Sequence, residues 1–453
     1  MPMSISIPLR PLAFATFLAL LPAILPAQEA PKKEISEAVS GELGKLRELN
    51  QAKDNAGAIK LLDSLLATAV DPSYDLALLS QIKAQILLSD NKLDPSVPLL
   101  EKALSLGQQY SFFDEKALLD SQYLLAQILY QQGTEAKDAA KQQALFDKAY
   151  VYVSAWLTRT TKPTVEAYHL ASTILYTQST VDASKPDIVK VNQAQKLAEK
   201  GLYLQLKPKD QLYVLILASL QQQGENVRAA EMLEVLVKQN PTNSQYWQQL
   251  AAAYFGLAGD AKIDSEVERY NLRALLTMER AQAKGFLNGP KENFTVIALC
   301  FTLQQYDRAI ELLEAGLDKG TIESSRRNWE LLASAYQQLR KPEKSIDTYT
   351  RAIKVWPQDG QLEYSLAQLY YAESKVSDAY ESLAKGVRKA SLEKPGQAHQ
   401  FLAYLAFELQ RYKDTVTWAE AAGKYPDAKK SDLDKLIRAA KEALQDRAAT
   451  TTT

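Results

Sequence analysis

The stretch RRNWELLASAYQQLRKPEKSIDTYTRAIKVWPQD, residues 326–359, decides the fold of this chain. Its first half carries four residues at spacings of three, four and seven, which places them on one face of a helix: Trp329, Leu332, Ala333 and Tyr336. After a polar break at Lys341-Pro342, its second half carries three more at helical spacing: Ser345, Tyr349 and Ala352. Pro357 ends the unit, so the stretch predicts a helix, a tight turn and a second helix.

The sizes of these residues have a packing reason. Small side chains at Ala333, Ser345 and Ala352 allow two antiparallel helices to approach closely, while the larger side chains fill the space around the contact. A single helix pair leaves one face uncovered and needs stacked neighbours. The unit therefore predicts that the chain repeats.

At all eight signature positions this unit resembles the tetratricopeptide (TPR) repeat. The pattern recurs along the chain, and its first half is restated at Trp247, Leu250, Ala251 and Tyr254. The resemblance implies an all-α fold, a right-handed superhelical solenoid of about ten helix pairs over residues 28–424. The segment 425–446, apolar on one side and charged on the other, is predicted to be a capping helix that covers the last repeat, and the tail 447–453 to be disordered.

Three units, near residues 121–158, 167–206 and 247–284, are longer than the others by about 11 residues. An insertion of that length is close to three whole helical turns, so it can lengthen a helix without rotating its apolar face. Helix-forming sequence before the small residues Ala149, Ala194 and Ala274 favours second helices that start early and project from one edge. Looser loops of equal length are the alternative.

The N-terminus has the layout of a secretory signal peptide. Arg10 precedes the apolar run LAFATFLALL, and a small residue, Ala27, precedes polar sequence, so residues 1–27 are predicted to be cleaved on export. The apolar run is too short to span a bilayer, although an uncleaved anchor is the alternative. The mature chain is therefore expected to have no membrane span.

Composition excludes several classes of function. The chain has 53 basic and 54 acidic side chains, so it lacks the basic surface that binds nucleic acid. Cys300 is its one cysteine and His169 and His399 its two histidines, which leaves little material for a metal site or a catalytic pair. We therefore expect no enzyme activity, no cofactor and no metal, and we expect Cys300 to be a packing residue.

In the TPR family the first helices line a concave groove that suits extended peptides or a partner helix. The resemblance carries the groove positions of this family onto two units of the chain. They are Gln248, Ala252 and Phe255 in the sixth unit, and Glu330, Ser334 and Gln337 in the eighth. The alternative is that each is an ordinary solvated surface residue.

A closer resemblance covers roughly residues 211–422. Three features there lie outside the generic repeat: Gly285-Phe286, Gly316 with Gly320, and the segment 394–399 with sequence KPGQAH. This region is similar to periplasmic TPR proteins associated with TonB-type energy-transduction systems. The resemblance implies a protein exported to the periplasm of a Gram-negative-type bacterium and partners such as TonB, ExbB and ExbD proteins.

The leading hypothesis from the sequence is a non-enzymatic periplasmic scaffold that binds proteins and serves TonB-type outer-membrane transport. The alternative is a chaperone or assembly factor that holds extended segments of cell-envelope proteins.

Overall fold

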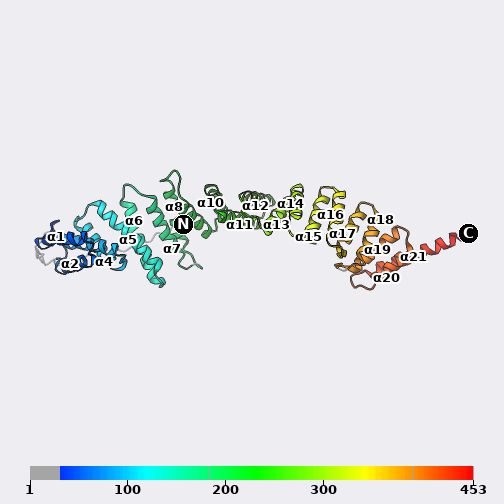
Figure 1. Ribbon diagram of the computed structural model, residues 1–453, viewed down its shortest axis with the longest axis horizontal. Coiled ribbons are helices and arrows are strands. Elements are labelled where there is room, and N and C mark those ends of the chain that lie inside the picture. The colour runs from blue at the N-terminus through cyan, green and yellow to red at the C-terminus, as the bar shows by residue number, and fades with distance from the viewer. Residues whose placement is uncertain (1–30, 183, 390, 452–453) are drawn as a thin grey trace, which may run out of the picture. The chain divides into compact units, whose positions relative to one another are not determined.

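The computed structural model of the chain describes residues 31–182, 184–389 and 391–451 (Figure 1). Over these ranges the backbone forms 21 helices and no strand, which confirms the predicted all-α fold. The chain divides into two compact units, one ending at Leu215 and one beginning at Ile216. The predicted signal peptide, residues 1–27, lies outside the described residues.

The helices of the first unit are α1 (Glu37–Gln51), α2 (Asn55–Thr68), α3 (Tyr74–Ser89), α4 (Leu93–Tyr110), α5 (Glu115–Glu135), α6 (Ala139–Arg159), α7 (Val165–Ser179) and α8 (Ile188–Leu202). The boundary between the units falls within α9 (Asp210–Gln222). The helices of the second unit are α10 (Asn226–Gln239), α11 (Ser244–Asp260), α12 (Asp264–Ala283), α13 (Pro290–Thr302), α14 (Tyr306–Lys319), α15 (Arg326–Gln338), α16 (Pro342–Val355), α17 (Gly360–Ala372), α18 (Val376–Gly386), α19 (Pro395–Glu408), α20 (Tyr412–Ala422) and α21 (Lys430–Thr451).

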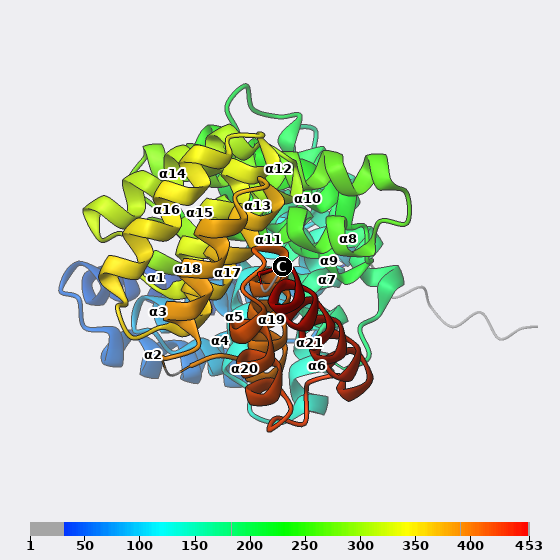
Figure 2. The ribbon, with the colours of Figure 1, turned by 90° about the vertical axis from the view of Figure 1, so that its right-hand side faces the viewer.

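Within each unit a helix packs mainly on the helices that precede and follow it in the chain. Odd-numbered helices are the first members of pairs and even-numbered helices the second, so the described chain holds ten pairs and a final helix. This agrees with the predicted ten pairs and capping helix. α21 packs on both helices of the last pair, α19 and α20 (Figure 2).

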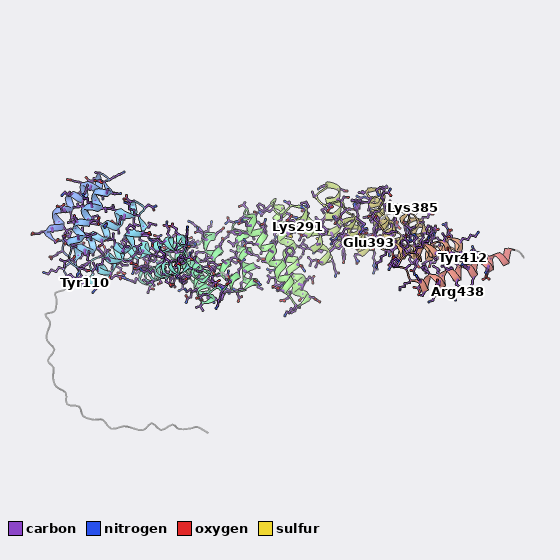
Figure 3. All side chains as sticks on the ribbon, turned by 90° about the horizontal axis from the view of Figure 1, so that it is seen from below. Tyr110, Lys291, Lys385, Glu393, Tyr412 and Arg438 are labelled. Carbon is purple, nitrogen blue, oxygen red and sulfur yellow. The ribbon has the colours of Figure 1, made fainter. Side chains whose placement is uncertain are left out.

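α21 begins and ends five residues later than the predicted capping helix 425–446, so its helical backbone runs to Thr451, into the tail 447–453 that was predicted to be disordered. The guanidinium of Arg447 stacks on the ring of Tyr412, 5.0 Å from its centroid, and donates a hydrogen bond to the carbonyl oxygen of Gln410 at 3.3 Å. Figure 3 labels Tyr412. These contacts hold the start of that segment on the last helix pair.

Seven of the pairs are joined by the same three-residue turn. In the pair α15 and α16, Arg340 has a left-handed backbone with φ of 55°, and the amide of Lys341 donates to the carbonyl oxygen of Tyr336 at 2.9 Å. This bond closes the end of the first helix in the Schellman arrangement. The left-handed residue stands two positions before the second helix in each such pair: Lys53, Asn91, Gly224, Gln304, Arg340, Ser374 and Gln410.

Among the described residues, the turns of the three long pairs contain no left-handed residue. In the pair α5 and α6 the chain instead leaves the first helix through an extended residue, Ala136. α6 begins ten residues before Ala149, whereas α16 begins three residues before Ser345, and α5 continues six residues past Leu129, whereas α15 continues two past Tyr336. The inserted residues therefore lengthen both helices and leave the turn at three residues.

Of the other two long pairs, one divides the insertion as α5 and α6 do and one does not. α11 and α12 follow the division of α5 and α6, since α12 begins ten residues before Ala274 and the turn has three residues. In the pair α7 and α8 the connection spans residues 180–187, so part of the insertion is loop. The early start of the second helix, predicted from sequence, is present in all three pairs, and the first helix lengthens as well.

The added turns of α5 and α6 pack against each other. Gly133 has no side chain, and a Cβ at this position would lie 2.5 Å from the ring of Phe146, which is fully buried. The side-chain amide of Gln142 donates to the carbonyl oxygen of Gly133 at 3.1 Å. This extension is a packed hairpin with its own core residue.

Candidate functional site

The residues that define the repeat belong to the packing of the helix pairs. Eleven of the twelve are buried: Trp247, Leu250, Ala251, Tyr254, Trp329, Leu332, Ala333, Tyr336, Ser345, Tyr349 and Ala352. The twelfth, Pro357, is exposed just after α16 ends. Cys300 is also buried, and burial raises the pKa of its thiol to about 11.

The six predicted groove residues lie on the first helices of their pairs. Gln248 and Ala252 are exposed on α11, and Phe255 is half-buried there. On α15, Ser334 is half-buried, and the exposed Gln337 donates from its side-chain amide to the hydroxyl of Ser345 at 3.3 Å. Glu330 is also half-buried, so all six side chains are at least partly exposed to solvent.

Glu330, the remaining predicted groove residue, sits among charged neighbours. Burial raises the pKa of its carboxyl, Arg326 lowers it, and Glu393 and Asp359 raise it further. Arg326 pairs with Glu393 at 2.6 Å and with Asp359 at 3.9 Å. The cation that lowers the pKa of Glu330 is thus shared with two other carboxylates.

A pocket of about 750 Å³ lies between the first helices of the last two pairs, α17 and α19, and the start of α21. α17 contributes Tyr364, Gln368 and Tyr371, and α19 contributes Gln397, Gln400, Phe401 and Tyr404. The chain that enters α21 contributes Asp427 and Lys429, and α21 itself contributes Asp432 and Leu436. Its wall is therefore mostly aromatic rings and side-chain amides, with charged groups on one side.

The pocket residues occupy the same repeat positions as the predicted groove residues. Glu330, Ser334 and Gln337 follow the tryptophan position by one, five and eight residues, and in the next pair these offsets give Tyr364, Gln368 and Tyr371. In the last pair the first two offsets give Gln400 and Tyr404. Sequence reasoning applied the offsets to the sixth and eighth pairs alone and so missed this pocket, although extending them to the ninth and tenth would have found five of its residues.

Four rings form an aromatic ladder in the pocket wall, with members taken alternately from α17 and α19. The ring centroids of Tyr364 and Phe401 are 6.3 Å apart, those of Phe401 and Tyr371 5.5 Å, and those of Tyr371 and Tyr404 6.0 Å. Each pair meets edge to face, at 79°, 86° and 80°, an arrangement that the ring quadrupoles favour. The ladder is thus a wall of fixed rings.

Polar contacts fix the two ends of the pocket. The carboxylate of Glu408 accepts hydrogen bonds from the hydroxyls of Tyr404 at 2.7 Å and Tyr371 at 3.2 Å. The hydrogen bond that Tyr404 accepts from the Tyr371 hydroxyl at 3.3 Å, and the one that it donates to Glu408, raise the pKa of Tyr404. At the other end, Asp427 accepts from the backbone amide of Gln397 at 3.0 Å.

Residues 394–399, which lie outside the generic repeat, shape that second end. A Cβ on Gly396 would lie 2.8 Å from a carboxylate oxygen of Asp427, so glycine allows the chain before α21 to approach α19 closely. The ring of His399 is buried, with Nδ1 2.7 Å from the carbonyl oxygen of Pro395, and it stacks on Tyr425 at 5.3 Å. His399 is therefore a packing residue that supports the pocket from behind.

The first unit has a pocket of about 360 Å³ at related positions. Tyr123, Gln127 and Tyr130 of α5 line it at the same three offsets, and His169 of α7 faces them. Burial lowers the pKa of His169, and Glu166 raises it. The use of tyrosine and glutamine at groove positions thus recurs in both units.

Residues 329–361 match the family model described as a tetratricopeptide repeat. The chain contains a TPR repeat. The match begins in α15 and includes all of α16, so it covers the unit from which the fold was predicted.

Solved structures with helix-repeat folds align with the chain at low similarity. MamA 41-end from Desulfovibrio magneticus RS-1 has 19% identity and a TM-score of 0.27, with 41% of this chain and 96% of that chain covered. The APC/C hetero-tetramer Cut9-Hcn1 has 16% identity and a TM-score of 0.27, with 88% and 76% covered. No curated protein sequence matches the chain.

No group of three or more His, Cys, Asp or Glu side chains in residues 31–182, 184–389 and 391–451 is arranged to hold a metal ion. Among the helices of those same ranges, none combines the length and the apolar character that crossing a bilayer requires.

Proposed function

We propose that this chain is a non-enzymatic protein-binding scaffold and that the pocket between α17, α19 and α21 is a contact site for its partner. The observation that carries the proposal is the coincidence of that pocket with the groove positions of two successive helix pairs. Tyrosine supplies large contact area with little conformational entropy to lose, which suits a binding surface.

The experiment is affinity capture from a cell-envelope extract with the tagged chain and two variants. Tyr404→Ala removes a ring that is 41% exposed in the pocket, and Tyr203→Ala removes a ring that is 88% exposed outside it. We expect Tyr404→Ala to lose the captured protein and Tyr203→Ala to retain it. Equal capture by both variants would show that the partner binds elsewhere.

We further propose that the partner belongs to a TonB-type system and that the chain acts in the periplasm. The support is the sequence resemblance over residues 211–422, together with the place of its KPGQAH segment at the pocket wall. Capture of TonB, ExbB or ExbD proteins, lost in Tyr404→Ala, is the expected outcome. Capture of a mixture of unfolded outer-membrane proteins would instead favour a chaperone.

The predicted export of the chain can be tested separately, from the N-terminus of the purified protein. We expect the N-terminal residue of the protein purified from its native cells to follow Ala27, because the signal peptide is then removed. N-terminal sequencing of the periplasmic fraction tests this, and an intact Met1 in the cytoplasmic fraction would overturn it.

A further inference from the structure

We propose that the pocket between α17, α19 and α21 binds a proline-rich segment in the polyproline II conformation that carries a basic residue. The inference rests on the proposed function, because it names the chemistry of the partner segment at the same pocket. Three features of the pocket carry it: the spacing of the aromatic ladder, the side-chain amides beside it, and the charges at its edge.

The spacing of the rings fits a polyproline II helix. Tyr364 and Tyr371 are seven residues apart on α17, which places them about 10.5 Å apart along the helix axis. A polyproline II helix rises about 9.3 Å per turn of three residues, so prolines one turn apart meet successive tyrosines. Phe401 lies between these two rings in the ladder and forms the partition between two proline sites.

The amides beside the ladder suit an extended backbone. The backbone of a polyproline II segment makes no internal hydrogen bonds, and its carbonyl oxygens need donors. Gln368 and Gln397 line the pocket, and neither side-chain amide has a hydrogen-bond partner among the described residues. They are placed to donate to the carbonyl groups of a bound segment.

The same lining argues against a helical partner segment. A helix in a groove buries an apolar face and needs aliphatic surface to receive it. Leu436 is the one aliphatic side chain among the residues that line this pocket. Aromatic rings with interspersed amides are instead the surface to which proline-rich segments dock.

The charges at the edge favour a basic residue in the bound segment. Asp427 and Asp432 line the pocket against a single lysine, Lys429. Glu408 adds a third carboxylate at the far end, where it holds the two tyrosine hydroxyls. The excess of negative charge attracts a lysine or arginine and disfavours an acidic segment.

The test uses fluorescein-labelled synthetic peptides of about ten residues, half of them proline, with a central lysine, alanine or glutamate. Binding to the full mature chain is measured by fluorescence anisotropy. We expect affinity to fall from lysine to alanine to glutamate, by about threefold at each step. Tyr404→Ala should weaken the lysine peptide about fivefold to tenfold, and Tyr203→Ala should leave it unchanged.

A charge variant separates the two parts of the inference. Asp432→Asn should weaken the lysine peptide about threefold and leave the alanine peptide unchanged, because only the first places a cation near that carboxylate. Circular dichroism melts show whether each variant is folded. An unchanged affinity of the lysine peptide for folded Tyr404→Ala would overturn the inference.

The outcomes also distinguish this inference from the proposed function. If a partner is captured through Tyr404 but none of the three peptides binds, the pocket is a contact site and the proline-rich chemistry is wrong. If neither a partner nor a peptide depends on Tyr404, both proposals fail.

Discussion

The ammonium of Lys389 lies 2.8 Å from a carboxylate oxygen of Glu363, and the side chains keep only 19% and 7% of their exposure. The other carboxylate oxygen of Glu363 accepts from the hydroxyl of Ser382 at 2.8 Å. Glu363 occupies the repeat position that Trp329 fills in the preceding pair. An ion pair between the buried Glu363 and the partly buried Lys389 thus replaces an aromatic side chain at this point of the fold.

Removing one partner of this ion pair should destabilise the second unit. Lys389→Met leaves the Glu363 carboxylate buried without its cation, so we expect a loss of about 2 to 4 kcal/mol at neutral pH by thermal melt. The double variant Glu363→Gln with Lys389→Met should recover most of the loss, because no buried charge remains. Lys341→Met, whose pair with Asp307 is exposed, should change stability by less than about 0.5 kcal/mol.

The packed extension of α5 and α6 should not accept a side chain at Gly133. Gly133→Ala places a Cβ against the ring of Phe146, and the overpacking should cost about 1 to 3 kcal/mol. In α11, Gly256→Ala meets no atom within 4 Å and should stabilise by about 0.5 to 1 kcal/mol. Equal effects of the two substitutions in denaturant titrations would contradict the packed hairpin.

The close contact between α15 and α16 depends on Ala333. The side chain is fully buried, and its carbonyl oxygen accepts from the Ser345 hydroxyl at 2.9 Å. Ala333→Leu should cost about 1 to 3 kcal/mol in a thermal melt, because the helices must separate. Ala252→Leu, on the exposed face of α11, should stay within about 0.5 kcal/mol of the parent chain.

Glu330 should make stability depend on pH in an unusual direction for a carboxyl group. Its pKa is higher in the folded protein, so its contribution favours folding when it is protonated and is lost as pH rises through that pKa. Glu330→Gln should therefore raise the melting temperature at pH 7, and the gain should shrink as the pH falls below the pKa of the carboxyl. A gain that grew on acidification would show that Arg326 dominates over burial.

The sequence predicted most of the helix pairs because the small and large residues that set helix contact recur at fixed spacings. It also predicted the length of the three insertions. Hydrophobic periodicity cannot show, however, how the inserted residues are divided between the two helices of a pair. An insertion near a whole number of turns leaves the apolar face in register on either side of the turn. The helix bounds of the structure show that both helices of each long pair lengthen, and in α5 and α6 the contact of Gly133 with Phe146 packs the added turns together.

The sequence could predict the groove residues of the candidate pocket but not its charged edge. The groove offsets, carried from the sixth and eighth pairs to the last two, lead to Tyr364, Gln368, Tyr371, Gln400 and Tyr404. The edge formed by Asp427, Lys429 and Asp432 depends on how α21 returns across α19, which is a tertiary contact between segments about 30 residues apart. No local pattern encodes that contact, although Gly396 marks the place where it occurs.

The neighbour-to-neighbour packing within each unit also has a mechanical consequence. A pulling force applied across the second unit passes through its helix contacts in series, since most helices touch only those beside them in the chain. We therefore expect the helix pairs of this unit to separate and unfold one after another under force. A scaffold of this kind can stay bound to a partner that moves, because extension of its helix repeats reduces the force on the bound segment.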